Sequence, residues 1–360
     1  MRNQYLDVKP GGAARVVFSR NLAFFTGHAA PQYSTLREQA AAVLRRYDEL
    51  FEQFGLKKKN IVYSACFLKN ADDEKDYTDA YFQWIDPENP PAGYTVTGIP
   101  IQHSPVGDNI LIELQLIVAT DPDAKIERHD VTQGSRMVVY DGMAYFTGHV
   151  YPKADTLGEQ TAGVLRRYDE LFEKFGLKKE NVVAQYGFIK NVDSYAEIAK
   201  PMAEYFGENP PAGVVVQACP NQNTALGPKL EIELAMLVAT GDSPKIVRRD
   251  VAPGMSRVVE YNGLAWFTGH SARPGFATLK EQTQAVLSRY DELLEKFGYK
   301  KENLVMAYGF VRDIEQYEQF EEPMKAWRDA EHPPAGVLVQ AIPSGENNQL
   351  ELQLIVSLDD

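Results

Sequence analysis

The stretch TLREQAAAVLRRYDELFEQFG, residues 35–55, returns with small changes at 156–176 and at 278–298. One tyrosine in each copy measures the period: Tyr47, Tyr168 and Tyr290 are 168 − 47 = 121 and 290 − 168 = 122 residues apart. That spacing is the usual length of a whole domain. The sequence therefore predicts three repeated domains, which we place at residues 1–122, 123–243 and 244–360.

Both ends of the repeated stretch carry helix signals. Thr35 with Glu38 three residues later forms a capping box, and Gly55 is suited to the left-handed conformation that ends a helix. Apolar residues recur at helical spacing and make one wide stripe, with charged residues on the other side. We expect this helix to cover a sheet; its stripe is Leu36, Ala40, Val43, Leu44, Tyr47, Leu50, Phe51 and Phe54.

Composition narrows the classes of partner. The chain of 360 residues has a formal net charge of −13 and no long basic run, which argues against a nucleic-acid partner. No stretch approaches the roughly 20 apolar residues of a membrane span, and the start lacks an apolar targeting core. The two cysteines, Cys66 and Cys219, do not fall at equivalent positions, so we expect neither a disulfide framework nor a cysteine metal site. A cytoplasmic location follows as the expectation.

The order of elements is the same in each repeat. Two strands around a tight turn precede the long helix, and a strand at 61–68, a shorter helix, a strand at 95–99 and a last strand at 110–119 follow it in the first copy. The last strand alternates, with one oily face and one mixed face that carries Glu113 and Gln115. The order ββαβαββ predicts an α+β layer whose mixed sheet face packs against the two sister repeats.

These features resemble the Rid family, also called YjgF-like proteins, which are small enamine and imine deaminases and their relatives. The strand ending in Thr-Gly and the Glu-Gln helix ending in Phe-Gly occur in all three repeats. The segment at 86–92 contains Asn-Pro-Pro-Ala, which returns at 209–212, and its Pro-Pro-Ala part returns at 333–335. The resemblance covers nearly the whole chain.

The resemblance implies three tandem RidA-like (chorismate mutase-like) domains. Members of the family are typically homotrimers with sheets inside, helices outside and small-molecule clefts between neighbours. Three units in one chain imply a covalently closed pseudo-trimer, which fusion would protect from dissociation on dilution. We expect a monomeric chain of this kind and leave further self-association open.

The sequence departs from the family pattern at the residue that binds the substrate carboxylate. In deaminating members an arginine directly after Pro-Ala holds the substrate carboxylate, and a side-chain carboxylate near the end of the fold positions the attacking water. The positions that match the arginine are Gly93, Gly213 and Gly336, and glycine cannot replace a bidentate guanidinium. Two registers are open for the carboxylate: Leu111, Glu231 and Gln349, or Glu113, Glu233 and Glu351.

Arginines and histidines at repeated positions are the other candidates. Arg15, Arg136 and Arg257 either bind an anion from another wall of the cleft or form a structural ion pair with the common glutamate. His28, His149 and His270 are candidate general acids or bases, or else they hydrogen-bond at a strand end; a shared metal is disfavoured. The adjacent threonines either line the same pocket or fit a half-buried strand: Thr26, Thr147 and Thr268.

The sequence is compatible with two functions. The first is a divergent family member that binds a small metabolite between repeats and has lost standard 2-iminoacid deamination, which the missing arginine favours. The alternative is an active enamine or imine deaminase, or a related hydrolase, with a relocated arginine and His/Glu acid–base groups. Either function implies a small-molecule ligand, with an anion as the first candidate, and no cofactor, metal, nucleic acid or membrane.

Overall fold

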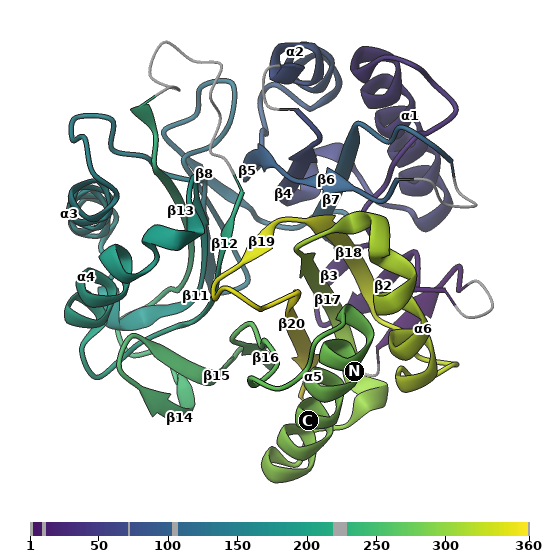
Figure 1. Cartoon of the computed structure of the whole chain (residues 1–360). Coiled ribbons are helices and arrows are strands. Elements are labelled where there is room, and N and C mark those ends of the chain that lie inside the picture. Colours follow the sequence, from purple (N-terminus) through teal and green to yellow (C-terminus); the bar gives the residue numbers. More distant parts are fainter. Residues whose placement is uncertain (1–2, 9–11, 71–72, 103–106, 219–228, 359–360) are drawn as a thin grey trace.

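A computed structural model describes residues 3–8, 12–70, 73–102, 107–218 and 229–358. Each repeat is a sheet with two helices on its outer face, and the three repeats surround a common centre (Figure 1). The predicted arrangement of sheets inside and helices outside is confirmed. The first repeat consists of β1 (Gln4–Leu6), β2 (Val16–Ser19), β3 (Leu22–Phe25), α1 (Leu36–Phe54), β4 (Ile61–Leu68), α2 (Glu74–Trp84), β5 (Ala92–Thr97), β6 (Ile99–Pro100) and β7 (Ile112–Ala119).

The other two repeats follow the same order. The second consists of β8 (Glu127–His129), β9 (Met137–Tyr140), β10 (Met143–Phe146), α3 (Leu157–Phe175), β11 (Val182–Ile189), α4 (Ala196–Phe206), β12 (Ala212–Gln217) and β13 (Ile232–Ala239). The third consists of β14 (Val247–Ala252), β15 (Met255–Tyr261), β16 (Leu264–Phe267), α5 (Leu279–Phe297), β17 (Leu304–Val311), α6 (Tyr317–Trp327), β18 (Ala335–Gln340), β19 (Ile342–Pro343) and β20 (Leu350–Ser357). Short 3₁₀ helices occur at Lys58–Asn60, Lys179–Asn181, Val192–Ser194, Lys301–Asn303 and Ile314–Gln316.

The local signals read from the sequence place the long helices and the hairpins. Thr35 and Glu38 form the predicted capping box of α1, and Gly55 ends the helix at φ 68°. The turn residues Arg20, Asp141 and Asn262 have φ of 56°, 48° and 47°. Such positive φ matches the right-handed twist of the flanking strands.

Pairing between distant segments changes two strand predictions. β5 begins at Ala92, earlier than residue 95, because Ala92 and Gly93 pair in parallel with Tyr63 and Ser64 of β4. An edge strand that the sequence reading did not contain, β1, β8 or β14, adds to the first hairpin of each repeat. Neither feature has a local apolar signal, so only the partner strand reveals it.

The repeats also exchange strands. β6 of the first repeat pairs with β18 of the third, and β19 of the third pairs with β12 of the second. The sheet orders are therefore β1-β2-β3-β7-β4-β5, β19-β12-β11-β13-β10-β9-β8 and β14-β15-β16-β20-β17-β18-β6. Each exchanged strand thus extends the sheet of a neighbouring repeat.

Two kinds of core result from this arrangement. Ile112, Leu114 and Leu116 of β7 pack under α1 within the first repeat. The opposite sheet faces of all three repeats bury one common core that includes Tyr63, Tyr186 and Tyr308. The partner expected for the mixed face of the last strand is thus the neighbouring repeats.

No helix in the described part of the chain is long and apolar enough to cross a membrane. Cys66 is a buried free thiol, and Cys219 lies outside the described residues.

Candidate functional site: clefts between repeats

Among the described residues, two cavities at the seams between repeats are large enough for a small molecule. The 1–3 cleft, of about 310 Å³, lies between the first and third repeats, and its lining includes Arg15, His28, Glu113, Met324 and Arg328. The 1–2 cleft, of about 370 Å³, lies between the first and second repeats, and its lining includes Ser64, Glu74, Tyr77, Tyr81 and Glu233. Both volumes fall within the range of small-molecule sites.

The predicted Thr and Gly positions meet at each seam. The Gly336 N–H donates to Thr26 Oγ1 at 2.9 Å, and the Gly27 N–H donates to the Gly336 carbonyl at 2.9 Å. The same two bonds join Gly93 to Thr147 and Gly148, and Gly213 to Thr268 and Gly269. Each threonine hydroxyl also donates to a carbonyl of its own repeat. The threonines thus hold neighbouring repeats together, and three such seams close the ring.

The second carboxylate register is the one that reaches the seams. Glu113, Glu233 and Glu351 are 7–8% exposed, and a Cβ atom added at Gly27, Gly148 or Gly269 would collide with the carboxylate that lies against it. Burial raises the pKa of each of the three carboxyl groups to about 8. They are therefore predominantly protonated at neutral pH and able to donate a hydrogen bond.

Glu231 lies elsewhere. Its carboxylate is 27% exposed and lies 3.5 Å from Lys190 Nζ, and Glu231 is not among the residues that line the two clefts. The alternation of a strand does not separate the two residues, because residues two apart share a face. Glu231 lies just before β13, which begins at Ile232, whereas Glu233 lies within the strand and lines the 1–2 cleft.

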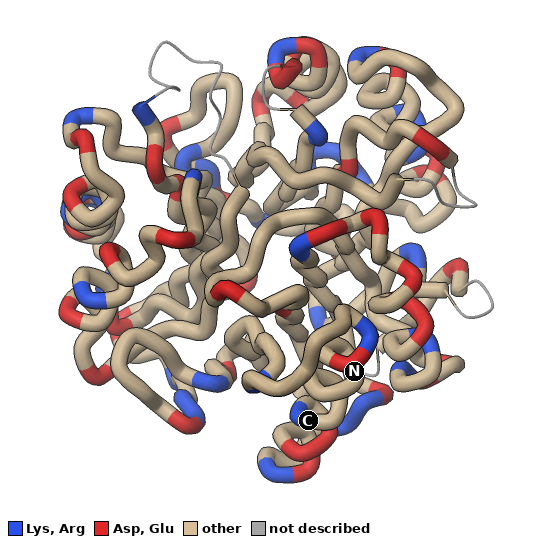
Figure 2. Tube along the Cα trace, in the orientation of Figure 1, with Lys and Arg blue, Asp and Glu red and all other residues tan. Residues whose placement is uncertain are grey.

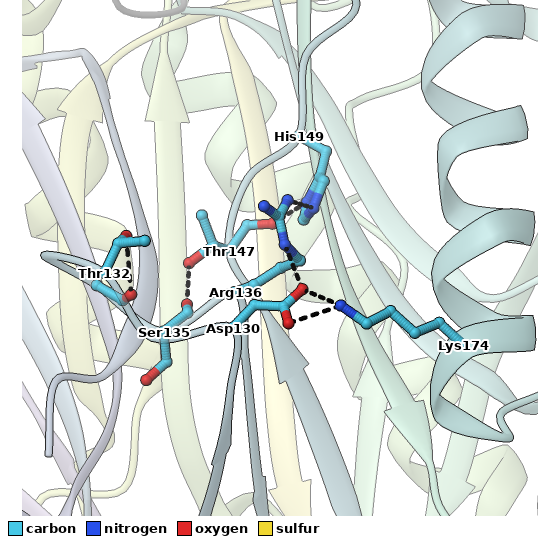
Figure 3. Close-up of polar contacts among 8 residues, drawn as sticks. Asp130, Thr132, Ser135, Arg136, Thr147, His149 and Lys174 are labelled. Carbon is cyan, nitrogen blue, oxygen red and sulfur yellow. Dashed lines mark hydrogen bonds and ion pairs between the residues drawn. The ribbon is translucent and has the colours of Figure 1, made fainter.

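The arginine at the repeated position contacts the histidine of its own repeat in each case. Arg15, Arg136 and Arg257 place Nη1 at 3.3, 3.4 and 3.0 Å from Nε2 of His28, His149 and His270. In the second repeat the chain of contacts continues from Arg136 to Asp130 and on to Lys174 (Figure 3). The arginine partners are therefore histidine in all three repeats and also aspartate in the first two, rather than the glutamate that the structural alternative proposed.

The histidines are held in their neutral form. The Nδ1–H of His28 donates to the Thr26 carbonyl at 2.7 Å, which leaves Nε2 to accept from Arg15. Burial, together with the charge of Arg15, lowers the pKa of His28 to about 3, and burial lowers the pKa of His149 and His270 to the same value. This arrangement favours the strand-end hydrogen-bonding role over acid–base chemistry at neutral pH.

The three arginines differ in what surrounds them. Arg15 lines the 1–3 cleft, and its Nε donates to Asp7. Arg136 is outside the lining of the 1–2 cleft. In the third repeat Asp250 bonds Lys296 instead, and Arg257 Nε is buried with no hydrogen-bond partner among the described residues. Only the first arginine thus faces one of the two clefts.

Sequence reasoning missed Arg328. This residue follows α6, is 8% exposed, places Nη2 at 2.8 Å from Glu321 Oε1, and lines the 1–3 cleft. The signal was present, because Trp327 and Trp84 are equivalent at 327 − 84 = 243 residues, and the residue after each is Arg328 or Ile85. Comparing the repeats at that offset would have revealed a guanidinium in one cleft and an aliphatic side chain in the other.

No group of three or more His, Cys, Asp or Glu side chains among the described residues is arranged to hold a metal ion.

Comparison with known proteins gives one consistent result for each repeat. A family model described as Endoribonuclease L-PSP matches residues 13–120, 129–240 and 248–358. A RutC family protein of Haemophilus influenzae is 31% identical over 104 residues, which are 29% of this chain and 90% of that protein. The RutC family protein YoaB of Escherichia coli is 29% identical over 113 residues, or 31% of this chain and 98% of the relative.

Solved structures give matches of two lengths. A YjgF family protein of Neisseria meningitidis is 27% identical, with a TM-score of 0.31, and covers 32% of this chain and 97% of its own. A chorismatase covers 83% of this chain and 93% of its own, with a TM-score of 0.55 and 9% identity. The second likeness shows the fold alone, over more than two repeats.

Proposed function

The chain belongs to the endoribonuclease L-PSP family, with three copies of its domain, and on this basis we propose that its 1–3 cleft binds a small organic anion. The observation that carries the proposal is the guanidinium of Arg328, which pairs with Glu321 in the lining of a cavity that Glu113 and Arg15 also line. Arginine pairs with carboxylates through charge-assisted hydrogen bonds, which are strong in a partly dehydrated site. Arg328, which directly follows α6, would thus bind the ligand carboxylate in place of the family arginine, whose position is occupied by Gly336.

The remaining walls define the rest of the ligand. Ile101, Ile110, Phe320, Met324 and Leu338 line the cavity with apolar surface. A site of this kind suits a carboxylate attached to an apolar body, since pockets bind mainly through apolar contact and orient the ligand with a few polar groups. The neutral Glu113 carboxyl would donate a hydrogen bond to such a ligand.

We do not propose a nuclease activity, although the family is described as Endoribonuclease L-PSP. The net charge of −13 opposes binding to a phosphate backbone. Acidic and basic residues are interspersed along the outer helices, and no continuous basic stripe follows the described elements in that view (Figure 2).

Calorimetric titration with benzoate, at fixed pH and ionic strength, tests the anion site. In Arg328→Ile, which installs the residue of the equivalent position in the first repeat, affinity should fall about 10- to 100-fold. Lys325→Ala is the control, because it removes one positive charge from the exposed side of the same helix. Unchanged affinity in Arg328→Ile, or an equal loss in Lys325→Ala, would contradict the proposal.

A second candidate is hydrolysis of a C=N bond in the same cleft. Glu113 favours this reaction, because the raised pKa of about 8 leaves a protonated carboxyl in a cleft that two guanidinium groups also line, and such a carboxyl can serve as a general acid. The assay is hydrolysis of 2-iminoacids generated in situ. Turnover in the wild type that is lost in Glu113→Gln, with benzoate affinity retained, would support the enzyme; no turnover with any imine would leave a binding protein.

A further inference from the structure

The two clefts differ in whether cationic side chains are part of their lining. The 1–2 cleft has two charged or chargeable carboxylates, Glu74 and Glu233, and its described lining contains no Lys, Arg or His. The lining of the 1–3 cleft contains Arg15 and Arg328 beside the carboxyl groups of Glu113 and Glu321. The same fold thus places guanidinium groups in one seam, whereas carboxyl groups are the only acidic or basic side chains, tyrosines aside, in the described lining of the next.

Glu233 differs from its two counterparts in its contacts. Backbone hydrogen bonds from Leu338 and Val215 lower the pKa of Glu113 and Glu351, against the larger effect of burial. The carboxylate of Glu233 has no hydrogen bond or ion pair with any residue that the structure describes, although the residue is only 7% exposed. A buried polar group without a partner is costly, so this carboxylate is available to a ligand in the cavity that it lines.

The aromatic wall of the 1–2 cleft also departs from its counterpart. At the offset of 243 residues, Tyr77 and Tyr81 of α2 replace Phe320 and Met324 of α6. Both tyrosines line the cleft, and their ring centroids are 5.3 Å apart. Aromatic rings attract cations through the negative potential of their faces, and the attraction grows when the cation is dehydrated.

We propose that the 1–2 cleft is a separate binding site for a small organic cation, such as an alkylammonium group, held by Glu233 and Glu74 against Tyr77 and Tyr81. This site goes beyond the anion site of the 1–3 cleft and uses none of its residues. A cation would supply the missing partner of Glu233 and stabilise its ionised form.

The described groups around Glu233 include no cation that would already stabilise its ionised form. Burial and then the charge of Glu74 raise the pKa of Glu233 to about 8. Its other titratable neighbours are Tyr63, Tyr94 and Tyr168, whose pKa values the charge of Glu233 raises. The neutral His149 lies next to Gly148, against which the Glu233 carboxyl packs. None of these groups is a competing cation at neutral pH.

Titration of the full chain with tetramethylammonium chloride, by calorimetry at constant ionic strength, tests the site. This probe carries a fixed charge, so its own ionisation does not contribute to any pH dependence. We expect a Kd of about 1–10 mM, tightening as the pH rises from 6 to about 8 and then levelling, because a cation favours the ionised Glu233. Glu233→Gln should weaken binding about tenfold or more and remove the pH dependence.

Glu351→Gln is the control, since it replaces the equivalent buried carboxyl at the third seam. Its affinity for the probe should remain within about twofold of the wild type. Thermal unfolding of each variant verifies the fold, and Tyr81→Leu provides a second variant that should also weaken binding. The proposal would be overturned by unchanged affinity in Glu233→Gln, by an equal loss of affinity in Glu351→Gln, or by no binding of the probe to the folded wild type. These outcomes are independent of the affinity for benzoate in the 1–3 cleft.

Discussion

Gly93, Gly213 and Gly336 occupy the position where deaminating relatives are expected to have an arginine, but they do not have equal room for a side chain. A Cβ atom at Gly93 would collide with the backbone oxygen of Ser64, and one at Gly213 would lie 2.5 Å from Cγ of Gln185. At Gly336 the nearest atom, the Ala307 oxygen, would be at 3.7 Å. The three sites thus differ in what faces the glycine across the parallel strand pair: the backbone of β4 in the first repeat, a long side chain in the second, and room for a Cβ atom in the third.

We therefore expect Gly93→Ala to destabilise the protein by about 1–3 kcal/mol, because the backbone of β4 must shift. Gly336→Ala should change the free energy of unfolding by less than about 0.5 kcal/mol. Urea unfolding of the two variants measures the difference. Equal destabilisation would show that the glycine is required at the seam for a reason other than the space at Ser64.

The buried glutamates and histidines predict how stability depends on pH. Each seam glutamate has a folded-state pKa of about 8 against an ordinary 4.5, so the folded chain holds more protons than the unfolded chain between these values. Each histidine has a pKa of about 3 against 6.5, so there the unfolded chain holds more. The two effects oppose each other between pH 4.5 and 6.5.

Above pH 6.5 only the glutamates contribute, and stability should fall as the pH rises to about 8 and then level off. Below pH 4.5 the histidines act in the same direction as carboxylates of lowered pKa such as Glu281, and stability should fall as the pH falls. Urea midpoints between pH 4 and 9 measure the curve. The triple variant Glu113→Gln, Glu233→Gln and Glu351→Gln should remove most of the loss between pH 6.5 and 8, and a wild-type curve that rises across that window would contradict the assignment.

At the scale of the element, the long helices are specified at their ends and along one face. Thr278 and Glu281 of α5 bond reciprocally, as Thr35 and Glu38 do in α1. In α3 the Thr156 side chain accepts from the Glu159 N–H, at 3.3 Å. Backbone hydrogen bonds from Thr278 and Ala277, and the Thr278 hydroxyl, hold the pKa of Glu281 below its usual value. The caps satisfy N–H groups that a helix leaves unpaired.

Thr278→Ala should lower the free energy of unfolding by about 1 kcal/mol, because two N-terminal contacts of α5 are lost together. Thr278→Ser keeps the hydroxyl and should restore most of that stability. Chemical denaturation with both variants measures the effect. If alanine and serine behaved alike, the cap would not be the source of the stability at this end.

At the scale of the whole molecule, fusion allows the seams to differ. A ring of identical subunits must have identical clefts, because symmetry repeats every substitution. Here one chain supplies Ile85 to the 1–2 cleft and Arg328 to the 1–3 cleft. The common core and exchanged strands meanwhile preserve the ring that all seams require.

This independence predicts the result of Ile85→Arg. The new guanidinium would lie beside Glu74 and Glu233, pair with a carboxylate and occupy the cavity, so tetramethylammonium binding should be lost. Benzoate affinity in the other cleft should remain within about twofold. Titration of one variant with both probes measures this. A loss of benzoate binding would reveal coupling between the seams.

The sequence by itself determined the family, the threefold repeat, the helix caps and the hairpin turns, and each of these is confirmed by the structure or the comparisons. These features depend on local spacing: a Thr with a Glu three residues later, or Asn262 before a glycine, has the same meaning wherever the chain goes. The alternation of the last strand likewise predicted a buried mixed face.

Only the tertiary structure decided which side chains share a cleft. It selected Glu233 over Glu231, turned His28 toward Arg15 as a neutral partner, and placed Arg328 in the same cleft as Glu113 from the far end of the chain. The physical reason is that each cleft is built from two repeats. A residue's neighbours across the seam depend on ring closure and strand exchange, and these follow from long-range pairing that no local pattern contains.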